Sequence, residues 1–258
     1  MKKYILDLKV RETVAVGKQF VLLRLTDSEP LPEMLPGQFV EVRVDNTPSV
    51  LLRRPISIHY YNKENNELGL LVQLIGDGTR WMATLKAGDT LNVVLPLGNG
   101  FTLPTSTDES PLLVGGGVGV APLLYLGMKL KEMGVTPTFL LGSRTENELM
   151  QIDEFEKYGP VYITTENGAV GEKGYVTQHS VLANNKFSQV YTCGPKPMMM
   201  AVARWAKSAN VPCEVSLENK MACGVGACLC CVEDTKEGNV CVCKEGPVFS
   251  IDKLSWQI

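Results

Sequence analysis

Histidine and basic charge are both scarce in this chain of 258 residues. The two histidines, His59 and His179, stand apart from any cysteine or carboxylate pattern typical of a metal site or a catalytic triad, so we expect neither to be catalytic. The 25 basic and 28 acidic residues give a formal net charge of −3. This balance leaves no basic footprint for nucleic acid, and we expect no nucleic-acid partner.

Long apolar runs are missing as well. No uninterrupted apolar stretch approaches the roughly 20 residues of a membrane-spanning helix, so we expect no membrane span. Near the start, Asp7 interrupts the apolar residues before a signal-peptide core of about 7–15 residues can form. We therefore expect a cytoplasmic protein, in a reducing compartment that disfavours disulfides.

The cysteines, in contrast, are concentrated: six of the eight lie between positions 223 and 243. The spacing C-x4-C-x2-C with a distant fourth thiol fits Cys223, Cys228, Cys231 and Cys243. This is the plant-type spacing of a [2Fe–2S] cluster, in which four thiolates hold two irons. Two glycines in the loop 224–227 suit a tightly curled backbone, because glycine accepts positive φ. The run predicts a [2Fe–2S] cluster on these four cysteines.

Other readings of the cysteines are less well supported. A structural zinc would need two C-x2–4-C knuckles, and Cys241-Val-Cys243 is too tight for the second one. Disulfides require an oxidising compartment, which nothing else in the sequence suggests. We interpret Cys230 and Cys241 as surplus buried thiols, although Cys230 lies next to Cys231 and a ligand swap between them stays open.

Residues 1–102 are expected to form a small antiparallel β-barrel. Four segments mix β-branched, apolar and charged residues with partial alternation, and a short helix is expected at 79–85. Proline, glycine and asparagine clusters separate the segments, as turns between short strands require. The four segments are 19–26, 38–44, 51–61 and 68–75.

From residue 103 the pattern changes to alternating strands and helices, which predicts a parallel sheet with helices on both faces. We place this α/β domain at 103–210 and a small cysteine-rich domain at 211–258, ending in a hairpin from Val232 to Phe249. The strands are expected at 111–114, 136–141, 161–164 and 189–192. The helices are expected at 121–133, 146–158 and 198–209.

A glycine loop follows the first of these strands and leads into a helix, the context in which such a loop can hold a pyrophosphate. A structural turn is the simpler alternative, and the pattern departs from G-x-G-x-x-G because Pro122 opens the helix. At the end of the next strand, Arg144 could meet a 2′-phosphate, while Glu146 or Glu148 could bond a 2′-hydroxyl, so NADH and NADPH stay open. The loop residues assigned to nucleotide binding are Gly115, Gly116, Gly117, Gly119, Ala121 and Pro122, together with Ser143 and Arg144.

Three further stretches are candidates for cofactor contact. Arg53 and Arg54 interrupt an apolar strand, which suits a phosphate contact, although a solvated edge arginine would explain one of the pair. The turn 76–79 leads into a helix and is a second candidate phosphate cradle, or a plain turn. Cys193 ends a strand at the ligand-binding edge of the sheet and could face a nicotinamide, or be a small buried thiol.

Taken in order, these motifs resemble the ferredoxin–NADP reductase superfamily, which joins a flavin-binding β-barrel to a nicotinamide-nucleotide domain. The resemblance implies a β-barrel, then a Rossmann-like parallel-sheet domain, then a small [2Fe–2S] domain. The matching residues are Arg54-Pro55-Ile56-Ser57 for the flavin, Gly78-Thr79 for its phosphate side, Gly115 to Pro122 for the nucleotide, and Cys193-Gly194-Pro195 with Lys196, Pro197 and Met198. We also assign Leu71, Val72 and Gln73 to cofactor binding.

The stretches Ser216 to Cys228 and Cys243 to Phe249 are more specific, and with them the whole chain resembles the electron-transfer subunits of dihydroorotate dehydrogenase B. The resemblance implies FAD, one [2Fe–2S] cluster and NAD. It also implies a partner, the FMN-containing catalytic subunit, in a heterotetramer of two plus two chains, and a role in the biosynthesis of pyrimidine (UMP). The expected function is to pass electrons from that partner through the cluster and FAD to NAD⁺.

Three rival functions follow from the same residues. A relative with the same modules could serve another assembly, such as an NADH-dependent ferredoxin:NADP⁺ oxidoreductase or a sulfide dehydrogenase. A zinc-stapled interaction module would have no redox function. A stand-alone flavin reductase would need no partner.

Overall fold

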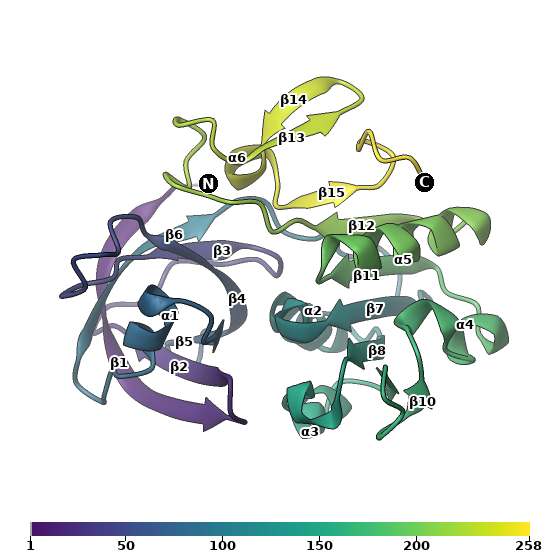
Figure 1. The fold of residues 1–258 in the computed structure, drawn as a ribbon, viewed down its shortest axis with the longest axis horizontal. Coiled ribbons are helices and arrows are strands. Elements are labelled where there is room, and N and C mark those ends of the chain that lie inside the picture. Colours follow the sequence, from purple (N-terminus) through teal and green to yellow (C-terminus); the bar gives the residue numbers. More distant parts are fainter. Residues whose placement is uncertain (1) are drawn as a thin grey trace.

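The computed structural model describes residues 2–258, and its first part is a closed six-stranded antiparallel barrel (Figure 1). The strands close in the order β1-β2-β5-β4-β3-β6, which confirms the predicted barrel. A short helix, α1 (Asp77–Met82), begins two residues earlier than predicted, and its last residue, Met82, is fully buried in the barrel core. The barrel strands are β1 (Tyr4–Val16), β2 (Phe20–Thr26), β3 (Phe39–Val42), β4 (Arg54–Asn62), β5 (Glu67–Gln73) and β6 (Thr90–Leu97).

The barrel interior is filled by alternate residues of its strands. In β1, Leu8 and Val10 are buried while Lys9 between them is exposed, as the two-residue period of a strand requires. Leu8 pairs with Leu91 of β6, and both side chains are completely buried. Burial of this apolar set stabilises the barrel, because about 25 cal/mol is gained per Å² of apolar surface removed from water.

The second part is a seven-stranded sheet in the order β10-β9-β8-β7-β11-β12-β15. All neighbours are parallel except β12 and β15. The strands are β7 (Pro111–Gly116), β8 (Thr138–Ser143), β9 (Val161–Thr165), β10 (Glu172–Lys173), β11 (Gln189–Cys193), β12 (Cys213–Ser216) and β15 (Val248–Ser250). The helices and 3₁₀ turns are η1 (Gly117–Val120), α2 (Ala121–Glu132), η2 (Glu146–Glu148), α3 (Ile152–Glu156), η3 (Val176–Gln178), α4 (Val181–Asn184) and α5 (Lys196–Ser208).

Helices cover both faces of this sheet, as predicted. Along β7, Leu112 and Val114 pack with the α5 residues Met199 and Ala203 in one apolar cluster. Leu113, between them, belongs to the opposite cluster with the buried residues of α2. The continuous apolar run of β7 is therefore buried on both sides, which is typical of strands in the middle of a parallel sheet.

Two predicted elements were wrong in detail. The helix expected at 146–158 is interrupted at Gln151, whose positive φ of 51° cannot continue an α-helix, so η2 and α3 replace it. The hairpin expected from Val232 to Phe249 contains only β13 (Val232–Thr235) and β14 (Gly238–Cys241). After it, α6 (Val242–Glu245) turns the chain and β15 joins the large sheet, where Phe249 is buried.

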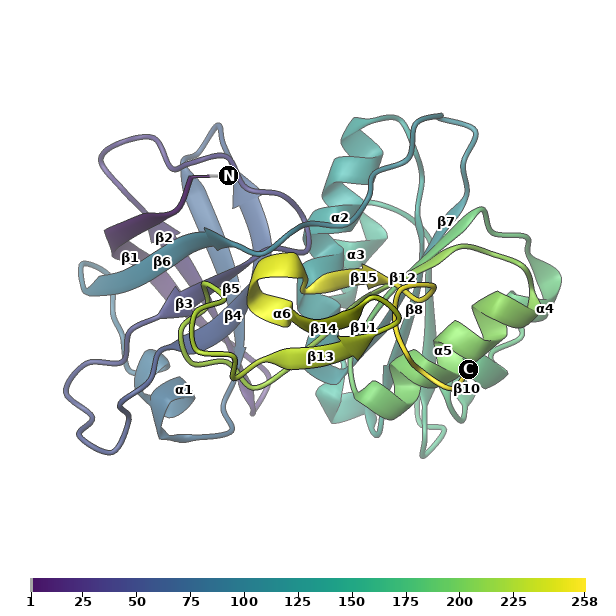
Figure 2. The same cartoon turned by 90° about the horizontal axis from the view of Figure 1, so that it is seen from above.

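The cysteine-rich segment lies across the boundary between the barrel and the sheet (Figure 2). Its buried residues Cys231, Val242 and Cys243 share one apolar cluster with Phe39 and Leu97 of the barrel. Within residues 2–258, no helix is long and apolar enough to cross a membrane.

Candidate functional site

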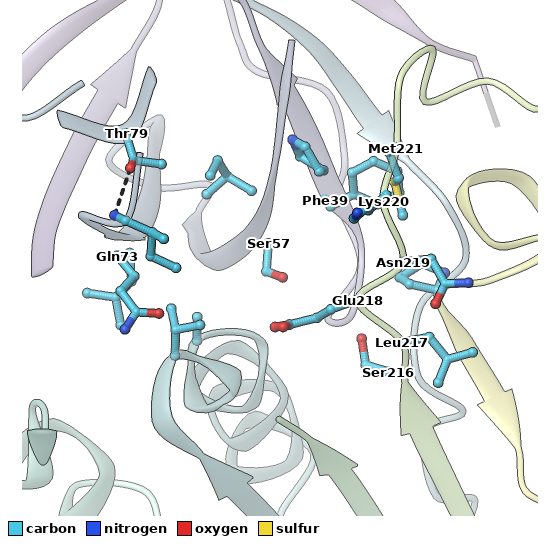
Figure 3. Close-up of a pocket in the computed structure, with 17 residues that line it drawn as sticks. Phe39, Ser57, Gln73, Thr79, Ser216, Leu217, Glu218, Asn219, Lys220 and Met221 are labelled. Carbon is cyan, nitrogen blue, oxygen red and sulfur yellow. Dashed lines mark hydrogen bonds between the residues drawn. The ribbon is translucent and has the colours of Figure 1, made fainter. Parts of the chain in front are cut away.

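A central pocket of about 310 Å³ lies where the three parts of the chain meet (Figure 3). The barrel supplies one wall from β4, β5 and α1, and the start of α2 supplies another. The third wall is the segment after β12, residues 216–221, which leads directly to Cys223. The predicted cofactor residues that line the pocket are Pro55, Ile56, Ser57, Leu71, Gln73, Thr79 and Ala121.

Some predicted flavin residues lie beside the pocket. The Arg54 guanidinium donates to the Leu52 carbonyl oxygen at 2.8 Å and lies against Gly78, where a Cβ atom would come within 3.2 Å of Nε. The Thr79 hydroxyl accepts hydrogen bonds from the backbone N–H groups of Ile75 and Gly76, which shapes the turn. Arg54 and the turn 76–79 thus form one polar corner suited to a phosphate.

The neighbouring arginine has a different role. Arg53 donates to Asn92 Oδ1 at 2.6 Å and to the Glu41 carbonyl oxygen at 3.1 Å, so its guanidinium holds barrel strands together. The sequence left open which of the two arginines was structural, and the contacts identify Arg53. The side chain of Val72 packs in the barrel core and does not line the central pocket, so its cofactor contact stays a prediction.

The predicted nucleotide loop and the Cys193–Pro195 turn lie against each other at the carboxyl edge of the sheet. A Cβ atom on Gly119 would be 2.4 Å from the Cys193 carbonyl oxygen, and one on Gly116 would be 2.4 Å from Met198 Sδ. Only glycine permits this approach, and Gly117 has a positive φ of 56°. The structure therefore brings together two motifs that lie about 75 residues apart in the sequence.

Ser143 and Arg144 lie at the same edge of the sheet. Gly116 of the nucleotide loop pairs with Gly142 of β8, and Ser143 and Arg144 come directly after Gly142 in the chain. The Ser143 hydroxyl donates to the Thr145 carbonyl oxygen, and Arg144 is exposed, with its backbone N–H bonded to Glu148. Glu146 accepts a hydrogen bond from Asn167, which lowers the pKa of its carboxyl.

Glu218 was not among the predicted site residues. Its side chain is exposed and lines the central pocket, and desolvation by the neighbouring protein raises the pKa of its carboxyl. Figure 3 shows Glu218 and Ser57 extending into the same space. Cys193 Sγ lies 4.0 Å from the Glu218 carboxyl, and burial, followed by that carboxylate, raises the pKa of the Cys193 thiol. The sequence signal was only its place in the stretch that resembles relatives.

Three of the predicted cluster cysteines, Cys223, Cys228 and Cys231, lie in the loop 223–231, and the fourth, Cys243, lies in α6 after the β13–β14 hairpin. Cys243 Sγ accepts a hydrogen bond from the Gly226 N–H at 3.1 Å, and Cys231 Sγ accepts one from the Cys243 N–H at 3.4 Å. A third N–H, that of Val225, reaches Cys223 Sγ at 3.5 Å. N–H donors of this kind stabilise the negative sulfur atoms of iron–sulfur centres, so the donor set fits a cluster.

The backbone of this loop confirms the expectation from its glycines. Gly224 and Gly226 have positive φ angles of 67° and 81°. A Cβ atom on Gly224 would lie 2.6 Å from Glu41 Cγ, so the loop rests directly on barrel strand β3. Burial raises the pKa of Cys223, but the N–H groups of Val225 and its neighbours outweigh this and lower it to about 6. A thiolate, the form that ligates iron, is thereby favoured.

Glu41 is a second polar residue that the sequence did not single out. Its carboxyl is completely buried under the loop, and neither oxygen has a hydrogen-bond partner within residues 2–258. Burial raises its pKa to about 7, while the positive charge of Arg53 opposes the shift. The only signal in the sequence was a glutamate in the apolar strand Phe39–Val42.

The surplus cysteines differ in their surroundings. The prediction that Cys230 is buried was wrong, because its side chain is exposed in the loop 223–231. Cys231 is 2% exposed and its Sγ accepts a hydrogen bond from the Cys243 N–H, which favours Cys231 over Cys230 as the ligand. Cys241 is buried and lies 3.8 Å from the Gly226 carbonyl oxygen. Among the described residues no three Cys, His, Asp or Glu side chains converge on one point, as a single zinc ion would require. A two-iron cluster instead divides its thiolates between two metals.

Two models of known protein families match separate parts of this chain. The family model described as the iron–sulfur cluster binding domain of dihydroorotate dehydrogenase B matches residues 218–255. The oxidoreductase NAD-binding domain matches residues 113–204. Together with the barrel and the central pocket, these matches define an oxidoreductase of the ferredoxin–NADP reductase type with an added iron–sulfur segment.

Relatives along almost the whole chain are more specific. The dihydroorotate dehydrogenase B (NAD(+)) electron transfer subunit of Fusobacterium nucleatum is 36% identical over 94% of this chain and 95% of its own length. That of Listeria monocytogenes is 38% identical over 96% and 98%. The chain belongs to this family of electron transfer subunits.

Solved structures share the architecture. A structure described for the NADH-dependent reduced ferredoxin–NADP oxidoreductase, in a study of electron bifurcation, superposes with a TM-score of 0.86, at 30% identity over 96% of this chain and 90% of that one. A ferredoxin reductase of carbazole 1,9a-dioxygenase superposes with a TM-score of 0.69 at 20% identity, which supports the fold alone.

Proposed function

We propose that this chain is the subunit through which a dihydroorotate dehydrogenase delivers electrons to NAD⁺ in pyrimidine biosynthesis. One observation carries the proposal: the segment 216–221 lines the central pocket and continues within two residues to Cys223. The nucleotide loop borders the opposite side of that pocket through Ala121. Three cofactor sites thus follow one another, from the cysteines through the pocket to the carboxyl edge of the sheet.

The residues suited to each group follow from this geometry. Arg54, Gly78 and Thr79 would hold the FAD pyrophosphate, and 55–57 with 71–73 would line its ring. The nucleotide loop, Ser143-Arg144 and the turn 193–195 would hold NAD. Cys223, Cys228, Cys231 and Cys243 would ligate the [2Fe–2S] cluster. We propose domain limits of 1–102, 103–210 and 211–258, with β12 and β15 of the third unit completing the large sheet.

The bound flavin supplies the conversion between hydride transfer and single-electron transfer. The protein contributes position and polarity around it. The Ser57 hydroxyl and the Glu218 carboxyl extend into the pocket, and the raised pKa keeps Glu218 able to donate a hydrogen bond as a neutral acid over a wider pH range. The buried Cys193 stays a neutral thiol and packs behind them.

The relatives' name implies a partner, the FMN-containing catalytic subunit, and we propose a heterotetramer of two plus two chains in the cytoplasm. This chain would then act without touching dihydroorotate itself. Its exposed thiols, Cys228 and Cys230, lie on the cluster loop, so this face is available to another chain.

The test is an anaerobic visible spectrum of the purified chain before and after NADH, repeated with the co-expressed partner and dihydroorotate. Flavin bands and a broad iron–sulfur absorption that both bleach with NADH are expected. Flavin bands without iron would indicate a simple flavin reductase and refute the cluster assignment. Zinc in a colourless protein would indicate the interaction module that is stabilised by zinc and has no redox function. Full steady-state turnover of NADH without any partner would indicate a stand-alone flavin reductase.

A second function is supported by one observation, the TM-score of 0.86 to the NADH-dependent reduced ferredoxin–NADP oxidoreductase structure. A chain serving such an assembly would pass electrons to a ferredoxin-linked partner. Turnover with ferredoxin and NADPH, but not with dihydroorotate, would favour it.

A further inference from the structure

His59 is completely buried between the barrel and the nucleotide-binding sheet, although the sequence offered no role for it. It belongs to β4, two residues after Ser57 of the central pocket. Its Nδ1 lies 2.8 Å from the Ala121 carbonyl oxygen, and its Nε2 lies 2.8 Å from Gln151 Oε1. One imidazole thus contacts two segments that lie 62 and 92 residues further along the chain.

Both contacts fall on the nucleotide side of the site. Ala121 is the first residue of α2, at the end of the nucleotide loop, and it also lines the central pocket. Gln151 lies between η2 and α3, in the segment that follows Ser143-Arg144. His59 therefore joins the strand that carries the pocket residues 55–57 to both segments that border the nucleotide site.

The hydrogen bonds have a fixed direction. Burial lowers the pKa of His59, so the ring is neutral at neutral pH and carries one N–H group. A carbonyl oxygen can only accept, so this N–H is at Nδ1 and points at Ala121. Nε2 is then an acceptor, so a neutral ring satisfies both contacts once the Gln151 amide, whose Oε1 faces Nε2 as placed, is rotated to present its NH₂ group. A fixed tautomer holds the first turn of α2 at a set distance from β4.

A second hydrogen bond between α2 and the barrel part of the chain provides a comparison. The buried Tyr125 hydroxyl, one turn further along α2, donates to the Met34 carbonyl oxygen at 2.8 Å. This bond also joins α2 to the barrel, but it does not touch the nucleotide loop. Loss of either bond weakens the docking of α2, whereas only His59 positions Ala121.

We propose that His59 is a positioning residue that sets the spacing between the flavin strand and the nucleotide loop, and so the alignment of the two rings between which hydride passes. The inference rests on the proposed function, because it assumes FAD in the central pocket and NAD at the loop. A shift of about 1 Å between reacting groups is enough to slow a reaction by about a hundredfold, so a small displacement of Ala121 has a measurable effect.

The experiment compares three variants of the FAD- and cluster-containing protein. His59→Leu removes both bonds at similar volume, His59→Asn keeps an N–H donor near the Nδ1 position, and Tyr125→Phe removes only the other bond of α2. Stopped-flow flavin reduction at saturating NADH, the NAD⁺ dissociation constant and amide hydrogen exchange of the stretch 113–125 are measured. FAD and iron content serve as integrity checks.

His59→Leu is expected to slow flavin reduction at saturating NADH at least about tenfold and to speed exchange in 113–125, while His59→Asn and Tyr125→Phe stay within about threefold of wild type. The proposal is overturned if His59→Leu stays within threefold, or if His59→Asn or Tyr125→Phe is slowed as much as His59→Leu. If His59→Leu does not retain FAD, Gln151→Leu replaces it, with slower flavin reduction supporting the proposal and an unchanged rate refuting it. If NADH does not reduce the flavin of the wild-type protein, the proposed function alone is refuted. Amide hydrogen exchange of 113–125 would still test whether His59 positions the nucleotide loop.

Discussion

Replacing Gly119 by alanine tests whether the nucleotide loop and the Cys193–Pro195 turn must approach as closely as they do. The added Cβ would lie 2.4 Å from the Cys193 carbonyl oxygen and 2.5 Å from Gly194 Cα, both backbone atoms that no side-chain rotation can move. An ordinary contact begins at 3.4 Å, so the two segments must separate by 3.4 − 2.4 = 1.0 Å. Both are proposed to hold the nicotinamide nucleotide.

The expected effect follows from that displacement. Overpacking of this kind costs about 1–3 kcal/mol of stability. Misplacement of the nucleotide by about 1 Å lowers the rate of flavin reduction by NADH about a hundredfold. FAD content should stay unchanged, because Gly119 is not part of the barrel wall of the pocket.

The assay is anaerobic stopped-flow reduction of Gly119→Ala by NADH, with urea unfolding in parallel. Gly76→Ala is a matched control for stability, because its Cβ would have no atom within 4 Å and its φ is negative. Wild-type hydride transfer in Gly119→Ala, with the clash confirmed by lost stability, would show that the nucleotide does not bind at this edge.

Three further variants test the other sites. Cys243→Ser should lose the iron and the broad visible absorption while Cys230→Ser keeps both, and equal iron content in the two would refute the ligand assignment. Arg54→Ala should raise the FAD dissociation constant about tenfold to a hundredfold through loss of a charged hydrogen bond, measured by flavin fluorescence, and unchanged affinity would contradict the phosphate corner. Burial raises the pKa of Glu41 from 4.5 to about 7, so its contribution to stability is complete below pH 4.5 and is lost as the pH rises through 7. In urea titrations of the apoprotein, Glu41→Gln should therefore have a free energy of unfolding about 3 kcal/mol higher than wild type at about pH 8.5, and no higher than wild type at low pH. An equal increase in the exposed control Glu237→Gln would refute the assignment.

The elements that sequence could predict are those with a strong local pattern. The helix 121–133 and the strand 111–114 were placed within two residues, because a run such as Pro111–Val114 has no stable position except between two helical layers. The positive φ of Gly224 and Gly226 was likewise a local property, readable from glycine in a ligand loop.

The parts that sequence missed depend on distant contacts. Glu41 is a single carboxylate buried under the distant loop 223–227, and Glu218 is one that lines a pocket built by distant segments. Gln151, where the helix is broken, bonds to His59, 92 residues earlier, and no window of local periodicity contains that contact. For the same reason β15 was assigned to a hairpin, since its partner strand β12 lies more than 30 residues away.

The pairing of β12 with β15 has a consequence for how the iron–sulfur segment is attached. Ser216 lies opposite Val248, so residues 217–247 leave the sheet and return to it at neighbouring positions. In topology the whole segment is one long excursion between two adjacent antiparallel strands. A short turn joining Ser216 to Val248 would keep the strand pairings of the barrel and of the seven-stranded sheet, while losing the β13–β14 hairpin and the pocket wall at 217–221. The cluster cysteines are thus carried by an insertion between two paired strands, and the two sheets beneath it are continuous without it.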